Sequence, residues 1–265
     1  MGALSNKLKR RRQSKETLFR LISNPLQTLI IHYSCESFYG IPDGKSPRIT
    51  SIAVRFYGTG QTVSFSIHKA AELKDTSLSN IDQKYDVFEK EMLNEYYKFV
   101  KAHRDHYWVH WNMRDINYGF EAINHRFSVL KGKPEIIPDS HKIDLSKILQ
   151  ELFGSSYIGH PRLENILDFN GIHRKDFLTG KEEAEAFENK EYVKLHQSTL
   201  RKVDVMQSLL ERTAEGSLKT KSSFKDKYGY HPQGIFEAIK DSWVYMVFNL
   251  IIGGIIGAVI SSLIG

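Results

Sequence analysis

Cysteine and histidine side chains, which most often act as nucleophiles, bases or metal ligands, follow no catalytic motif in this chain. The one cysteine, Cys35, excludes an internal disulfide and a cysteine zinc cage, and it fits a reducing compartment. A phosphate-binding loop, a dinucleotide-binding fingerprint and a Gly-x-Ser-x-Gly elbow are missing from the sequence. No two of six histidines have the i, i+4 spacing of a helical zinc site; they are His32, His110, His125, His141, His160 and His196. We expect ordinary polar or core roles for these histidines.

The elements that position these residues change from strands to helices along the chain. Residues 26–33 are rich in Leu and Ile, residues 48–57 and 62–68 follow as further strands, and glycine turns connect the three into a meander. Residues 87–102 have helical spacing, and residues 107–111 are an apolar burst typical of a buried strand. Later helices are predicted over residues 117–130, 142–153, 161–170, 181–187 and 192–211. This order predicts an α/β fold with a mixed sheet and helices on its faces.

The order of elements and the end of the first strand resemble the RNase H-like domain of DnaQ-type (DEDD) 3′–5′ exonucleases. In that family the first strand ends in Asp-x-Glu. Here the segment His32-Tyr-Ser-Cys-Glu-Ser-Phe38 has Glu36 at the position of the Glu and Ser34 at the position of the Asp. The resemblance covers roughly residues 26–212 and implies an RNase H-like mixed sheet flanked by helices.

Two later segments are similar to the second and third motifs of that family. His110-Trp-Asn-Met-Arg-Asp115 resembles His-Asn-x-x-Phe-Asp within one residue of register. Asp204 is the best match for the Asp of a late helix, and His196, eight residues earlier, is the histidine nearest to the family's catalytic base. The resemblance implies that Glu36, Asp115 and Asp204 bind Mg²⁺ or Mn²⁺ if the domain is catalytic.

Ser34 puts this catalysis in question. Two divalent cations about 4 Å apart stabilise both the attacking and the leaving oxygen of a phosphodiester, and such hard cations prefer carboxylate oxygens. A serine at the bridging position removes a negative charge, which predicts a catalytically weakened domain. An active metal-dependent 3′–5′ exonuclease and an unrelated α/β fold are the alternatives. Each carboxylate also has a simpler explanation: Glu36 as a solvated residue, Asp115 as a helix N-cap and Asp204 as a member of a surface ion pair.

Aromatic and amide side chains surround the second motif. The resemblance implies that Trp111, Asn112 and Tyr118 contact single-stranded nucleic acid, because bases stack on aromatic rings at about 1–3 kcal/mol each. Packing in the core is the simpler role for the two aromatic residues.

The N-terminal residues 1–25 are predicted to form a basic lead with a short amphipathic helix, which includes Leu18, Phe19, Leu21 and Ile22 and ends at Pro25. The chain has 265 residues and a formal net charge of +6, and much of this charge lies in Lys7, Lys9, Arg10, Arg11, Arg12 and Lys15. Such a cluster attracts the phosphate of anionic lipid or of nucleic acid. A solvated tail without a ligand is the alternative.

The C-terminal run over residues 243–265 is uncharged and apolar, and it is long enough to cross a hydrocarbon core of about 30 Å. Aromatic rings at its start favour the headgroup level, and small residues every fourth position allow close helix contact. These residues are Trp243, Tyr245, Gly253, Gly257 and Ser261. The basic residues before the run, including Lys240, indicate a cytoplasmic body.

These features together predict four segments: a basic lead (1–25), an RNase H-like domain (26–213), a connector (214–242) and a transmembrane helix (243–265). The predicted protein is a single-pass protein of an inner or plasma membrane, with a cytoplasmic domain that binds or senses nucleic acid. By analogy of architecture alone, it could serve antiviral defence as a homo-oligomer or with a partner protein. The further alternative is a non-enzymatic effector that perturbs the membrane by oligomerising through its transmembrane helix.

Overall fold

The computed structural model describes residues 2–37 and 46–240. The predicted transmembrane run lies outside these residues, together with Trp243, Tyr245, Gly253, Gly257 and Ser261. Among the helices that are described, none combines the length and the apolar character needed to cross a bilayer.

A five-stranded sheet forms the centre of the molecule, in the order β3-β2-β1-β4-β5. The strands are β1 (Thr28–Cys35), β2 (Ile49–Phe56), β3 (Thr62–Ser66), β4 (Tyr107–His110) and β5 (Lys142–Asp144). The first three form an antiparallel meander, whereas β4 and β5 continue the sheet beyond β1 in parallel. The predicted α/β class with a mixed sheet is confirmed.

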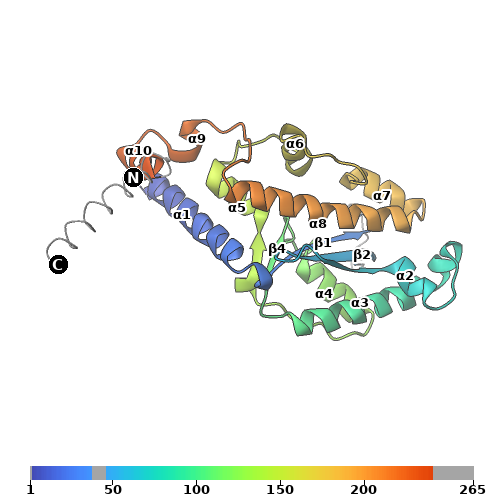
Figure 1. Cartoon of the computed structure of the whole chain (residues 1–265). Coiled ribbons are helices and arrows are strands. Elements are labelled where there is room, and N and C mark those ends of the chain that lie inside the picture. The colour runs from blue at the N-terminus through green and yellow to red at the C-terminus, as the bar shows by residue number, and fades with distance from the viewer. Residues whose placement is uncertain (1, 38–45, 241–265) are drawn as a thin grey trace, which may run out of the picture.

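Helices cover both faces of this sheet, as Figure 1 shows. One face is covered by α2 (Ile67–Glu72), α3 (Tyr85–Ala102) and α4 (Phe120–Val129). The other face is covered by α1 (Gly2–Ser23), α5 (Leu145–Phe153), α6 (Arg162–Phe169) and α8 (Tyr192–Ala214). The remaining helices are α7 (Gly180–Glu188), α9 (Phe224–Tyr228) and α10 (Pro232–Lys240).

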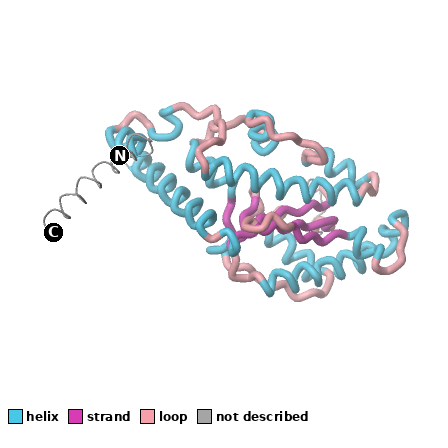
Figure 2. The backbone as a smooth tube through the Cα atoms, in the orientation of Figure 1, coloured by secondary structure: helices cyan, strands magenta, loops and turns pink. Residues whose placement is uncertain are grey.

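The central strand β1 is buried along its whole length, because it lies between the two helical layers seen in Figure 2. Successive side chains of a strand point to opposite faces. Ile31 and Tyr33 therefore enter the core with α3 and α4, whereas Ile30 packs with α5 and α8. The same alternation turns Ser34 toward α8. A polar side chain at such a buried position needs hydrogen-bond partners.

Several predicted boundaries are off by two or three residues, and two of these errors assign residues to the wrong kind of element. Residues 142–144 were expected to begin a helix, but they form β5, and α5 follows directly. Asp144 ends this strand and caps α5, since its carboxylate accepts a hydrogen bond from Lys147 N at 3.3 Å. The third strand was expected to reach His68, but it ends at Ser66, and α2 begins at Ile67. A three-residue strand is too short to show a period of two, so the helical pattern after it concealed β5.

Helices extend further than predicted in the basic lead and in the segment predicted as a connector. α1 runs through the whole basic cluster, and its Leu18 and Leu21 are buried against the body. The segment predicted as a connector (214–242) contains α9 and α10. A capping box of Ser223 and Asp226 begins α9, and this Ser-x-x-Asp spacing is a helix signal that the sequence already held.

Leu21→Ala is expected to lower the free energy of unfolding by about 2–5 kcal/mol, because the side chain is fully buried and its removal leaves a cavity. Phe19→Ala on the same helix is the matched control. Phe19 is 68% exposed, so its truncation should change stability by no more than about 0.5 kcal/mol. Chemical denaturation of the full chain in detergent measures both. Equally small effects would show that α1 does not belong to the folded body.

Candidate functional site

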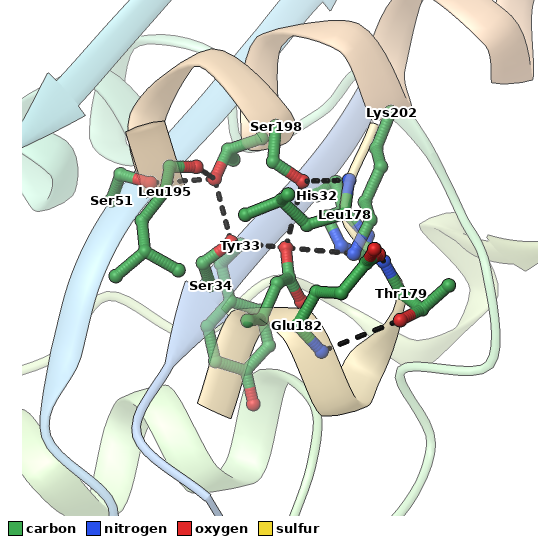
Figure 3. A network of polar contacts seen from close by, with 12 residues as sticks. His32, Tyr33, Ser34, Ser51, Leu178, Thr179, Glu182, Leu195, Ser198 and Lys202 are labelled. Atoms are coloured by element: carbon green, nitrogen blue, oxygen red, sulfur yellow. Dashed lines mark hydrogen bonds and ion pairs between the residues drawn. The ribbon is translucent and has the colours of Figure 1, made fainter. Parts of the chain in front are cut away.

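The carboxyl end of β1 carries a buried network of hydroxyl groups, shown in Figure 3. Ser34 Oγ lies 2.7 Å from Thr199 Oγ1 of α8 and donates to Glu183 Oε1 of α7 at 2.9 Å. Ser51 Oγ of β2 lies 2.6 Å from the same Thr199 Oγ1, and Ser198 Oγ donates to Glu183 at 3.0 Å. This hydroxyl network therefore joins two strands and two helices at one point.

An ion pair completes the hydroxyl network. Lys202 Nζ of α8 lies 2.7 Å from Glu183 Oε1, and the two side chains are only 6% and 13% exposed. Lys202 also lies over the ring of Phe177, with its ammonium 5.2 Å from the ring centre. A charged pair in a buried place is tolerated when both charges are paired and hydrogen-bonded. Ser34 and Ser198 supply such hydrogen bonds to the carboxylate.

Local sequence explains how α7 and α8 present these groups. Thr179 and Glu182 form a capping box that begins α7, and Glu183 follows in the first turn. The backbone NH of Leu178, just before α7, donates to Ser198 Oγ at 3.1 Å. On α8 the buried positions recur at helical spacing, and Lys202 belongs to that buried stripe.

A pocket of about 450 Å³ opens beside this network and is called the β1-end pocket here. Its lining comes from β1, α7 and the segment before α4: Tyr33, Cys35, Glu36, Ser37, Tyr118, Gly180, Lys181, Glu183 and Ala184. The rings of Tyr33 and Tyr118 are stacked with centres 4.8 Å apart. Glu36 accepts a hydrogen bond from Arg48 Nε at 2.6 Å. The pocket thus combines an aromatic wall with two carboxylates, both of which have cationic partners.

Burial keeps the other titratable groups of this site neutral. It raises the pKa of the Cys35 thiol, and the nearby charges of Glu183 and Glu36 raise it further. It also lowers the pKa of His32 well below the usual value, and the charge of Lys202 adds to this effect. A protonated thiol is a poor nucleophile. Cys35 and His32 therefore enter this site as neutral hydrogen-bonding groups.

The predicted residues of the second motif lie in different environments. Asp115 is exposed in a turn, where its carboxylate accepts a hydrogen bond from Asn117 N at 2.8 Å. It is not the N-cap of α4, since Gly119 has that position. Asn112 is exposed and accepts from Arg114, whereas Trp111 is buried with the core of the α8 face. Of the residues predicted to contact nucleic acid, only Tyr118 lines the β1-end pocket.

Asp204 and His196 lie away from Glu36. Asp204 forms ion pairs with Arg201 and with Arg55 of β2. In the sheet, Arg55 lies opposite Ile30, near the start of β1. Thr199 of α8 contacts Ser34, and Asp204 lies five residues further along that helix, a rise of about 7.5 Å. His196 is buried, its Nε2 lies 3.3 Å from Ser64 Oγ, and its ring packs on His68.

The carboxylates present do not fit a pair of divalent cations. Glu36 is bound to a guanidinium and Glu183 to an ammonium, so each already has its cation. Within residues 2–37 and 46–240, no three His, Cys, Asp or Glu side chains are grouped so that they could bind a metal ion. The structure does not bring Glu36, Asp115 and Asp204 together.

Sequence reasoning missed Glu183 and Lys202. One signal was available: Lys202 occupies a position that the helical period of Leu195, Val203 and Met206 assigns to the buried face. A charged residue on an apolar stripe requires a buried partner. The partner itself comes from another helix, so its identity could not be read from local spacing.

Comparison with known proteins gives no match to this chain, either among family models, among curated proteins or among solved structures.

Lys202→Met is expected to lower the free energy of unfolding by about 3–5 kcal/mol, because it leaves the Glu183 carboxylate buried without its cation. The double variant Glu183→Gln/Lys202→Met should recover most of this loss, since glutamine keeps an acceptor for Ser34. Lys194→Met is the control on the same helix, where the exposed pair with Glu191 contributes at most about 1 kcal/mol. Glu183→Gln is also measured alone. If its effect and that of Lys202→Met simply added up in the double variant, the two residues would not be a coupled pair.

Acid is expected to destabilise the protein through His110. Burial lowers the pKa of His110 to about 4, whereas the unfolded chain has the usual value near 6.5. The unfolded state therefore binds the proton first, and stability present above pH 6.5 falls by about 3 kcal/mol by pH 4. His110→Asn, which keeps an acceptor for Met113 N, should remove this part of the pH dependence. His125→Asn, at an exposed position, should leave it unchanged when unfolding is followed from pH 7 to pH 4.

Proposed function

We propose that this chain is a membrane-anchored protein whose cytoplasmic α/β domain has RNase H-like topology and binds nucleic acid without cleaving it. In this proposal the domain senses or sequesters a strand end, and the anchor keeps it at an inner or plasma membrane. A role in antiviral defence is an extension of the same proposal by analogy of architecture.

The arrangement of the sheet supports the topology. The meander of β1, β2 and β3 is followed by a helix and by β4 beside β1, which is the order that the resemblance implies. The strand end with Ser34 and Glu36 lies next to the late helix α8, where the resemblance expects the third motif.

The observation that carries the proposal is the Glu183–Lys202 ion pair next to Ser34. An exonuclease of this type needs negative charge here to bind two cations. This chain has instead a serine hydroxyl and an ammonium group, and the ammonium already neutralises the nearby carboxylate. We therefore favour binding over catalysis.

The β1-end pocket suits a terminal nucleotide. Its volume of about 450 Å³ lies within the range of small-ligand sites. Tyr118 is half-buried and is supported by the buried ring of Tyr33 stacked against it, so Tyr118 provides aromatic surface for a base. The carboxylates of Glu36 and Glu183 can accept hydrogen bonds from exocyclic amino groups, and Lys181, whose side chain is 87% exposed, can contact a phosphate.

The full chain in detergent is expected to bind end-labelled single-stranded DNA or RNA equally in chelator and in Mg²⁺ or Mn²⁺, without shortening it. Lys181→Glu should weaken binding about tenfold, the effect of losing one charge-assisted contact of about 1.5 kcal/mol. Lys84→Glu, the same charge change at another exposed position, should leave the affinity unchanged.

Two outcomes would overturn the proposal. Metal-dependent shortening from the 3′ end that is lost in Glu36→Ala would favour the exonuclease. Absence of binding by a folded sample would remove nucleic acid as the ligand.

A further inference from the structure

One face of α10 is apolar and exposed. Ile235, Phe236 and Ile239 are 48%, 55% and 51% exposed, and their spacing puts them on the same side of the helix. Single exposed apolar residues are ordinary on protein surfaces, but a contiguous set marks a place of interaction. These three residues are called the apolar face of α10.

Basic residues gather around this face. α1, α9 and α10 together carry ten Lys and Arg residues against three acidic ones, an excess larger than the net charge of +6 of the whole chain. Figure 1 shows these three helices at one end of the molecule. Lys9 and Arg10 of α1 are exposed there, and Arg12 pairs with Glu237 of α10 at 2.9 Å.

The three helices are held to one another by specific contacts. Arg11 lies over the ring of Tyr228 at 4.7 Å and donates to its hydroxyl at 3.3 Å. Lys7 Nζ donates to the carbonyl of Lys225 at 3.3 Å. α10 approaches α9 so closely that a Cβ on Gly234 would lie 2.0 Å from Tyr228 O. The apolar face of α10 therefore has a defined position relative to the basic helix α1.

We propose that α1, α9 and α10 form a docking surface for a bilayer that contains anionic lipid. This surface acts in addition to the membrane anchor, and the inference rests on the proposed function, which includes that anchor. The apolar face of α10 enters the boundary between headgroups and acyl chains, and Lys9 and Arg10 contact the headgroup phosphates.

Charge and chain continuity identify lipid as the occupant. A nucleic acid would match the positive charge but leave the apolar face of α10 in water. A second copy of the same surface would bring like charges together. The last described residue of α10 is Lys240, which stands shortly before the uncharged run over residues 243–265 in the sequence. A helix at this point of the chain comes within reach of any bilayer that the run enters.

The test uses the full chain in vesicles that carry a lipid-bound quencher. A fluorophore is attached to Phe236→Cys and, as the control, to Leu73→Cys, because Leu73 is 85% exposed at the end of α2. The unsubstituted chain measures any label taken up by the buried Cys35. In vesicles of phosphatidylcholine and phosphatidylserine, quenching at position 236 is expected to be several-fold stronger than at position 73.

Charge variants test the role of α1. Lys9→Glu/Arg10→Glu should reduce quenching at position 236 to the level of the control position. Lys84→Glu/Lys175→Glu makes the same change of charge at exposed positions elsewhere on the body and should leave the quenching intact.

Flotation of the chain with the vesicles, measured in parallel, separates this inference from the anchor. A chain that floats on every vesicle but shows no quenching at position 236 overturns the docking surface and keeps the anchor. A chain that floats only on anionic vesicles, with quenching, overturns the anchor and keeps the docking surface. A chain that floats on no vesicle, with or without anionic lipid, overturns both the anchor and the docking surface. Quenching between labelled copies in place of quenching by lipid would assign the apolar face of α10 to a second copy and overturn the inference.

Discussion

A buried lysine and a buried glutamate meet at the end of the central strand, and the arrangement of three elements depends on their contact. Taking the charges of Glu183 and Lys202 out of water is costly, and their mutual attraction offsets this only with good geometry and further hydrogen bonds. The hydroxyls of Ser34 and Ser198 satisfy that requirement. The pair and its hydrogen bonds therefore join α7 and α8 to the end of β1, beside the β1-end pocket that Glu183 also lines.

The same interaction separates this site from a metal centre. Carboxylates that bind divalent cations must be free to share their oxygens with the metal. Here Glu183 already holds an ammonium and Glu36 a guanidinium. With the thiol of Cys35 kept protonated by burial, the groups at the end of β1 suit hydrogen bonding and stacking better than bond cleavage. This physical contrast is why recognition of a strand end is the function that we propose.

The opposite end of the molecule has another character. The positive charge of the chain is concentrated on α1, α9 and α10. α1 contacts α9 through Arg11 and Tyr228, and it contacts α10 through Arg12 and Glu237. In the proposed arrangement a rigid basic surface, and not a loose connector, stands between the body and the bilayer. The β1-end pocket would then keep a defined orientation to the membrane, which matters for a domain that has to meet a long polymer.

Sequence alone determined the features that depend on local period. Three strands of the meander, α3 and most of α8 follow from alternation and helical spacing, because each pattern lies within one element. The Ser-x-x-Asp at the start of α9 was equally local, although its short helix was missed. Tertiary structure decided the rest. Only the pairing of strands reveals β5, only the direction of α8 puts Asp204 with Arg55, and only packing brings Glu183 to Lys202. Glu183 and Lys202 are 19 residues apart on different helices, so no local period relates them. Their contact comes from packing, because a buried charge requires a counter-charge beside it.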